Sequence, residues 1–264
     1  MIRRLTFLLA LLLAGATAFA QTETGARASV SADYKILKGL HLSAEEEMRI
    51  DNNFGSVNSF RTGVQLSYKY RKAVKLGVGY TLINPFKATA KVYAPPRHRF
   101  YADITGYLPL GDFQLSLKER LQYTLRTGEF NVYQNTPGAL ALKSKLTLKY
   151  KGWRTVEPYA AFELRTALND PWGTISGSSQ TNSSGRTYYV YTPAGYSHIY
   201  NNRYRADIGA EIQFDKRHSL TPYLLIDSCS DYEIDTNKEG TRLFSAAYVA
   251  SLKLSLCLNY TYSF

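Results

Sequence analysis

Hydrophobic and polar residues alternate along most of the chain after its first twenty residues. From Leu254 to Phe264, every second position is a leucine or an aromatic residue, and the positions between are small or polar. Successive side chains of a β-strand point to opposite faces, so this pattern predicts a strand with one apolar and one polar face. Comparable alternation, over about ten residues each, recurs at 26–36, 60–70, 74–82, 97–108, 113–125, 139–150, 154–167, 203–214 and 219–230, and in one further strand before residue 52.

The connections between these segments predict how they are arranged. Short turns alternate with longer polar segments, which lie at 52–58, 84–96, 126–138, 169–200 and 231–242. Outer-membrane barrels typically have short periplasmic turns and long external loops. We therefore predict an all-β protein, a transmembrane antiparallel up-and-down β-barrel with its long loops outside.

The number of strands is less well defined by the pattern. The segments add up to eleven, whereas single-chain bacterial barrels have even numbers of strands. Because 26–36 is the least apolar segment on its outward face, it is the weakest member of the set. Ten to twelve strands are expected.

The beginning of the chain indicates export. Arg3 and Arg4 precede an apolar run that ends in Ala18-Phe19-Ala20, an A-x-A cleavage pattern. Residues 1–20 are therefore predicted to be a cleaved secretory signal peptide, and residues 21–264 a single barrel domain in the bacterial outer membrane. The net charge of +11 could indicate nucleic acid binding, but an exported chain does not encounter nucleic acid.

Aromatic residues stand where the segments meet short turns or the end of the chain. They are Tyr34, Tyr70, Tyr150, Phe214 and Phe264. In a bilayer this level is the headgroup interface, where aromatic rings settle. Their placement favours an outer-membrane barrel surrounded by lipid over a secreted soluble β protein.

Several stretches resemble a known family. They are KGLHLSAEEEMR (38–49), FRTGVQLSYKY…LGVGYTL (60–82), RHRFYAD (97–103), LKERLQY (117–123) and NRYRADIGAEIQF (202–214). The chain resembles a family of outer-membrane β-barrels known only as a domain of unknown function and common in gut-type Gram-negative anaerobes. The resemblance implies the fold and no particular activity. The strand that ends in Phe264 also resembles the signal read by the bacterial barrel-assembly machinery, which is therefore an expected partner.

Long charged side chains gather on the polar face and are predicted to line the lumen. The predicted set is Glu45, Glu47, Arg49, Arg61, Arg97, Arg99, Asp103, Lys118, Arg120, Arg203, Arg205, Asp207 and Asp227. Folding the hairpins about their turns places Glu47 opposite Arg61, Asp103 opposite Lys118, and Arg205 roughly opposite Asp227. Such a lumen is either plugged by cross-strand ion pairs or a thin pore that favours small anions.

Two acidic residues break the apolar face. Glu46 lies between Ala44 and Met48, and Glu119 lies between Leu117 and Leu121. A carboxylate facing lipid is costly, although less so than a basic side chain. These two residues are therefore expected near a membrane interface or against a protein partner.

Catalytic and metal sites are not indicated. His41, His98, His198 and His218 are scattered and form no motif with serine like that of outer-membrane lipases and deacylases. The segment 235–240 imitates the start of an EF-hand loop, but its twelfth position is Ala246 instead of glutamate. We expect no cofactor and no metal.

Cys229 and Cys257 are the only cysteines of the chain. They fall on the lumen face of the last two strands. They either form a cross-strand disulfide in the oxidising periplasm or are two isolated small residues.

Three functions remain open from the sequence. The first is passive permeation of small solutes with a preference for anions. The second is a plugged barrel with a structural or surface-interaction role, for which the Tyr- and Gly-rich segment 169–200 is either a recognition loop, a cover over the pore or a mobile polar loop. The third is a lipid-modifying enzyme.

Overall fold

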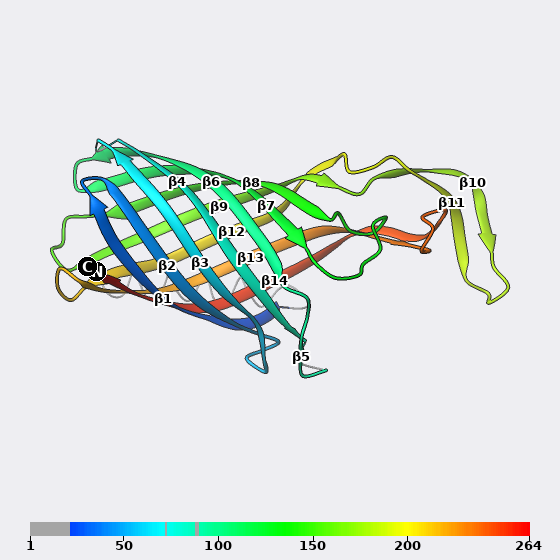
Figure 1. The fold of residues 1–264 in the computed structure, drawn as a ribbon, viewed down its shortest axis with the longest axis horizontal. Helices are drawn as coiled ribbons and strands as arrows, with labels where there is room; N and C mark the ends of the chain where they lie inside the picture. The colour runs from blue at the N-terminus through cyan, green and yellow to red at the C-terminus, as the bar shows by residue number, and fades with distance from the viewer. Residues whose placement is uncertain (1–21, 72, 88–89) are drawn as a thin grey trace, which may run out of the picture.

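The structure is a computed structural model that describes residues 22–71, 73–87 and 90–264. The predicted signal peptide, residues 1–20, lies outside this part of the chain. The described residues form fourteen strands (Figure 1). Within them, no helix is long and apolar enough to cross a membrane.

Eleven of the strands close into a barrel. Around it they follow the order of the chain: β1 (Thr22–Leu37), β2 (Leu40–Asp51), β3 (Ser56–Tyr70), β4 (Val74–Lys87), β6 (Arg97–Leu110), β7 (Phe113–Arg126), β8 (Gly138–Tyr150), β9 (Val156–Asp170), β12 (His198–Gln213), β13 (His218–Thr236) and β14 (Arg242–Ser263). Each strand pairs antiparallel with the next along this list. The predicted antiparallel β-barrel is confirmed.

The barrel is closed by a parallel pair. With an odd number of strands running alternately up and down, the first and last strands run in the same direction. β1 accordingly pairs with β14 in parallel, from Thr22 opposite Leu252 to Asp33 opposite Ser263. The weakest segment of the sequence, 26–36, is thus a full barrel strand, and the expectation of an even number is wrong. Three of its six outward positions in 26–36 are alanine, which explains why its apolar face was weak in the sequence.

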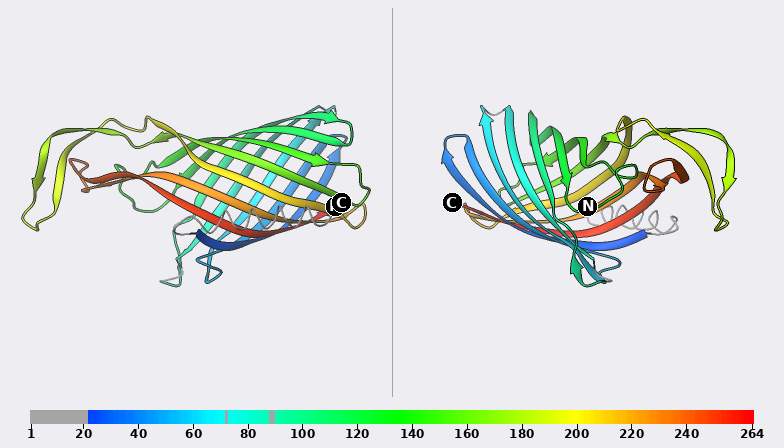
Figure 2. Two further views of the ribbon diagram at one scale, coloured as in Figure 1. Left: turned by 180° about the vertical axis from the view of Figure 1, so that it is seen from behind. Right: turned by 45° about the vertical axis from the view of Figure 1, so that its right-hand side comes forward.

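The two ends of the barrel differ, as the connections predicted. At the turn end, β2 follows β1 after two residues, and β7 follows β6 in the same way. Asp215 in the β12–β13 turn accepts hydrogen bonds from the backbone N–H groups of Arg217 (2.7 Å) and His218 (2.8 Å), which lower the pKa of its carboxyl group. Figure 2 shows the longer connections at the opposite, loop end.

The loop end contains more strand than the sequence indicated. β13 and β14 continue through most of the segment 231–242, and the segment 169–200 contains the hairpin of β10 (Gly173–Thr181) and β11 (Thr187–Pro193). This hairpin projects beyond the barrel (Figure 1) and pairs with β14 near Leu243. A short strand, β5 (Val92–Tyr93), pairs with the end of β4. β10 has polar residues on both faces, β11 has consecutive Tyr and Val residues, and β5 has only two residues, so none of the three shows the alternation of a barrel strand.

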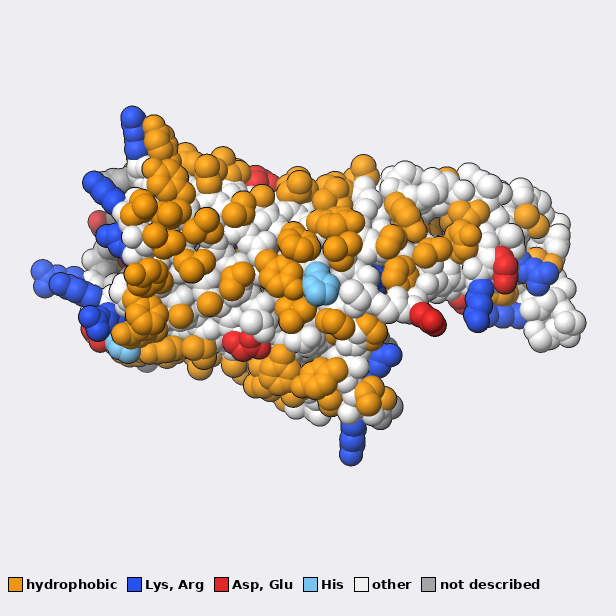
Figure 3. All heavy atoms as spheres, viewed as in Figure 1, with side chains coloured by type: hydrophobic (Ala, Val, Ile, Leu, Met, Phe, Trp, Pro, Cys, Tyr) orange, Lys and Arg blue, Asp and Glu red, His pale blue; other side chains and the backbone are white. Residues whose placement is uncertain are grey.

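The outside of the barrel is apolar and the inside is charged. Leucine, valine and aromatic side chains on the outward positions are exposed, for example Val64, Leu117, Leu121 and Phe162. Such residues occur on strands all around the barrel and form an apolar belt. Figure 3 shows this belt on one face, with basic side chains extending from the turn end. Inward positions hold buried polar residues such as Asp103 and Asp227. An exposed apolar belt of this extent is unusual for a protein in water.

The two cysteines are free and far from each other in register. On the β13–β14 ladder, Cys257 stands opposite Tyr223, and Cys229 stands opposite Ser251. The six positions between them correspond to about 20 Å along a strand, far beyond disulfide reach. Of the two alternatives left open by the sequence, the register therefore excludes the cross-strand disulfide and leaves two isolated cysteines.

We expect both cysteines to react with an alkylating reagent when the protein is denatured without reduction. Mass spectrometry should find two adducts per chain, and one adduct in the Cys257→Ser variant. Wild-type chain recovered without adducts would indicate a disulfide between the two cysteines and would contradict the observed register of β13 and β14.

Candidate anion-binding chamber

A cavity of about 710 Å³ lies inside the loop end of the barrel. Its wall comes from β2, β3, β4, β6, β7, β8, β9, β12 and β13, together with residues 134–136 of the β7–β8 loop. We call this cavity the chamber. Its size is within the range of small-molecule binding sites.

Basic side chains dominate the wall of the chamber. Ten of its residues are basic: Arg49, Arg61, Arg97, Arg99, Arg120, Arg126, Lys143, Arg165, Arg203 and Arg205. Five are acidic: Glu45, Glu47, Asp170, Asp231 and Glu233. Strand alternation explains why they gather here, since the other face of the same strands is apolar. The chamber therefore attracts anions.

Some of these basic residues are paired with carboxylates near the floor of the chamber. Arg49 Nε donates to Glu47 Oε1 (2.6 Å), and Arg61 lies 3.8 Å from the same oxygen. Arg205 Nη1 donates to Glu163 Oε1 (3.1 Å), to which Lys143 is also close (3.3 Å). Each of these two carboxylates therefore serves two basic residues of the wall.

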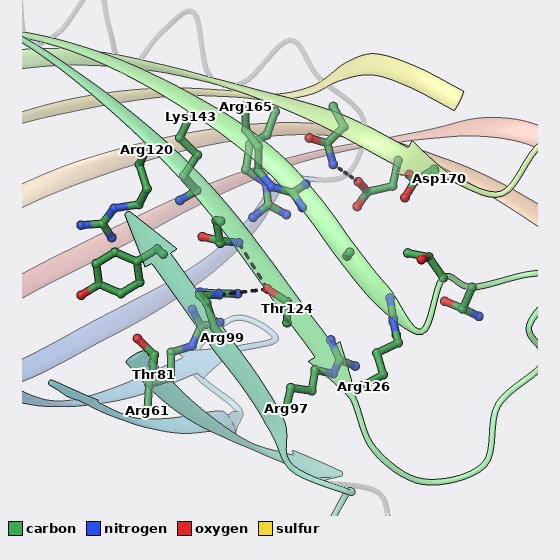
Figure 4. Close-up of a pocket in the computed structure, with 18 of the residues that line it drawn as sticks. Arg61, Thr81, Arg97, Arg99, Arg120, Thr124, Arg126, Lys143, Arg165 and Asp170 are labelled. Carbon is green, nitrogen blue, oxygen red and sulfur yellow. Dashed lines mark hydrogen bonds between the residues drawn. The ribbon is translucent and has the colours of Figure 1, made fainter. Parts of the chain in front are cut away.

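Four arginines have no such partner. Among the described residues, no carboxylate lies within ion-pair distance of Arg97, Arg99, Arg126 or Arg165. Arg99 Nε donates only to the hydroxyl of Thr124 (3.3 Å). The four side chains reach into one hollow from β6, β7 and β9 (Figure 4).

Asp103 is a second centre of charge, below the chamber. Its side chain is 1 % exposed and contacts Arg120 (2.6 Å) and Lys118 (3.2 Å). Gly77 of β4 makes room for it, because a Cβ there would lie 2.6 Å from Asp103 Oδ1. The Arg120 guanidinium also lies 3.9 Å from the ring centroid of Tyr101, a cation–π contact that fixes its position.

Asp227 links three strands. Its Oδ2 accepts hydrogen bonds from Arg205 of β12 (Nε, 3.0 Å) and Arg27 of β1 (Nη2, 3.4 Å), and Arg203 Nε lies 3.4 Å from Oδ1. The contact with Arg27 reaches past β14 and across the parallel seam. Together with Asp103, Lys145–Asp207 and Glu163, this network fills the middle of the barrel. We call it the ion-pair layer.

A second cavity, of about 290 Å³, lies at the turn end and is lined by seven residues. It shares no lining residue with the chamber. On β3, however, successive inward residues border the two cavities: Gln65 lines the chamber and Ser67 the turn-end cavity. On the β3 side, the ion-pair layer between the two cavities is therefore only about one side chain thick. Within it, Gln65 Nε2 donates a hydrogen bond to Asp103 Oδ2 (3.3 Å).

The predicted lumen residues divide between the chamber and the ion-pair layer. Glu45, Glu47, Arg49, Arg61, Arg97, Arg99, Arg120, Arg203 and Arg205 line the chamber. Asp103, Lys118, Asp207 and Asp227 form ion pairs in the layer below. The site prediction left out Arg126, Lys143 and Arg165. Lys143 and Arg165 have the same strand parity as the predicted set, whereas Arg126 lies in a segment that was taken for a loop.

Two of the three predicted cross-strand pairs are confirmed. Glu47 stands opposite Arg61, and Arg205 stands opposite Asp227. Asp103 stands opposite Arg120, so the predicted register is wrong by two residues, although Lys118 also forms an ion pair with Asp103 (3.2 Å).

The histidines have local partners. His98 contacts the hydroxyl of Tyr80 (2.8 Å), His218 that of Tyr260 (2.6 Å) and His198 that of Tyr248 (3.1 Å). His41 contacts Asp33 (2.8 Å). Within the described residues, no three His, Cys, Asp or Glu side chains are grouped as metal ligands.

The two outward acidic residues also have local partners. Glu46 accepts a hydrogen bond from the Thr62 hydroxyl, and Glu119 accepts one from the Ser144 hydroxyl, both at 2.6 Å. Each hydroxyl belongs to the directly opposite residue on the neighbouring strand. These bonds reduce the cost of an acidic group on an apolar surface. A protein partner at Glu46 and Glu119 stays a prediction.

A closed antiparallel barrel with an apolar outside and a charged inside defines a class, the β-barrels that enclose a polar lumen. Within that class, the chain belongs to the family described as "Protein of unknown function (DUF2490)", whose profile matches residues 25–221. The resemblance to an uncharacterised barrel family is thereby confirmed. A search of curated proteins found no match.

Proposed function

We propose that the protein is an integral barrel of the bacterial outer membrane. The observation that carries this proposal is the exposed apolar belt around a barrel with a charged interior. Lipid on the outside and water within the lumen account for both faces. In this placement the turn end faces the periplasm and the chamber opens to the cell exterior.

The C-terminal strand fits recognition by the barrel-assembly machinery. Phe264 donates its backbone N–H to Asp33 O (2.9 Å), and its ring packs against Tyr34 and Tyr262 at the turn end. The strand that closes the barrel therefore ends in an aromatic cluster on the periplasmic side, where that machinery acts.

Within this placement we propose a narrow, anion-selective channel. The chamber concentrates anions at the outer end, and the turn-end cavity faces the periplasm. Only the layer around Gln65 and Asp103 separates them on the β3 side. Rearrangement of side chains there would join the cavities into a thin path, lined mostly by basic groups.

The ion-pair layer favours a second candidate, a closed barrel. If its ion pairs persist, the chamber is a blind site that binds ligands from outside without passing them on. This function would reside in the chamber and in the loop-end strands.

Conductance in a planar lipid bilayer tests the channel. We expect small discrete steps and, under a salt gradient, a reversal potential with the sign of chloride permeation. Replacing Arg97 and Arg99 by glutamate should shift that potential toward cation permeation, because neither arginine neutralises a carboxylate in the wild type.

The control is Lys216→Glu/Arg217→Glu, which makes the same change of charge in an exposed turn. It should shift the reversal potential less. A silent bilayer with demonstrably folded protein would refute the channel and leave the closed barrel.

A further inference from the structure

The unpaired arginines of the chamber lie next to other cations. In the strand register, Arg97 stands directly opposite Arg126. Arg120, Lys143, Arg165 and Arg203 form an unbroken row around the barrel on β7, β8, β9 and β12. Like charges directly opposite each other destabilise a sheet. An arrangement of this kind calls for a compensating negative charge.

The protein supplies that charge only to part of the cluster. Arg120 and Arg203 have Asp103 and Asp227, and Lys143 has Glu163. Among the described residues, Arg97, Arg99, Arg126 and Arg165 form no ion pair, and the carboxylates of Asp170 and Asp231 act on Arg126 and Arg165 only from beyond ion-pair distance. The buried Nε of Arg203 lies 3.4 Å from Asp227 Oδ1, so it is held by the protein. The four arginines without an ion pair are therefore the groups of the chamber that are left for an anionic ligand.

We propose that the chamber is the binding site of a small-molecule polyanion with at least two phosphate or carboxylate groups. Arg97 and Arg126 hold one anionic group, and Arg99 and Arg165 hold the other. Guanidinium groups suit this role because they bind planar or tetrahedral oxyanions with two parallel hydrogen bonds.

The rest of the wall agrees with a small polar ligand. Thr81 and Thr124 flank Arg99 in the register and offer hydroxyl groups. A volume of about 710 Å³ is far larger than a single phosphate ion needs. This ligand site deepens the proposed function. It rests on the proposed membrane placement only in that the ligand would enter from the cell exterior. Binding itself requires only the folded barrel.

Calorimetric titration of the folded barrel in neutral detergent tests the site. The probes are inorganic pyrophosphate, citrate and acetate at equal ionic strength. At least one of the two polyanions should bind about tenfold or more tightly than acetate. The preferred polyanion tells whether phosphate or carboxylate is the natural chemistry. Equal binding of all three probes would overturn the proposal.

The variant Arg97→Gln/Arg126→Gln should weaken polyanion binding by about tenfold or more. Lys216→Gln/Arg217→Gln, with the same loss of charge outside the chamber, should leave it unchanged. Equal weakening by both variants would mean unspecific attraction and refute the site. Should the first variant not fold, Arg165→Gln provides the same comparison. Since titration in detergent does not depend on conduction, a silent bilayer and a missing ligand site are separate results.

Discussion

Replacing Asp227 by alanine is expected to lower the free energy of unfolding by about 3–5 kcal/mol, the largest effect of any single change considered. The reason is the number of partners that this carboxylate serves. Arg27, Arg203 and Arg205 all lie within 3.4 Å of it, inside the barrel. Without Asp227, they would remain as close positive charges, and the largest part of the cost comes from these unpaired groups.

The position of Asp227 adds to the effect. It connects β12 and β13 with β1, which lies beyond β14. The change should therefore loosen the closing seam as well as the interior. Urea titration of the barrel in lipid vesicles, followed by tryptophan fluorescence, measures the free energy of unfolding.

Asp235 provides the matched control. It forms an ion pair with Arg186 near the β10–β11 hairpin, where both side chains are about half-exposed, and it accepts a hydrogen bond from Gln134 (3.1 Å). An exposed pair contributes about 0–1 kcal/mol, so Asp235→Ala should have little effect. If Asp227→Ala were equally mild, the interior charges would be solvated and the lumen open, contrary to a filled ion-pair layer.

The sequence predicts correctly which residues face the lumen, because this depends only on the alternation within each strand. Strict alternation placed Glu47, Arg61, Arg205 and Asp227 on the inner face, and two of the predicted pairs agree with the ladders. A one-residue error would have moved each side chain to the other face, so parity is strongly constrained by the sequence.

Register was harder to predict because it depends on turn length. With 109–112 taken as a four-residue turn, Asp103 is placed opposite Lys118. In the structure β6 continues to Leu110, only Gly111 and Asp112 form the turn, and the pairing moves to Arg120. The parallel seam was likewise outside the reach of hairpin reasoning. For that reason the contact of Arg27 with Asp227 had no signal in the sequence.

For the chamber too, strand parity could be predicted from the sequence and contacts around the barrel could not. Parity identified most of its basic residues but could not tell paired from unpaired ones. That distinction depends on neighbours around the barrel, such as Glu163 between Lys143 and Arg205. The four unpaired arginines therefore became visible only when all strands were placed.

Placing an arginine at Leu117 is the sharpest test of the proposed membrane position. Leu117 is an outward residue of β7, between Gly106 and Leu146 in the register, and its exposure is 49 %. Counted from the turn, it lies near the middle of the apolar belt. An arginine near the bilayer midplane costs about 2–4 kcal/mol, and this loss should appear in the free energy of unfolding in lipid vesicles.

Leu110→Arg separates the effect of lipid from that of losing a leucine. Leu110 is also 49 % exposed, but it stands beside the β6–β7 turn, at the edge of the belt. There an arginine reaches the headgroups, and the expected cost is about 0–1 kcal/mol. In water both positions would tolerate arginine equally well, since both side chains are equally exposed. A clear difference between the two variants therefore supports a bilayer around the belt, and equal, small effects would contradict it.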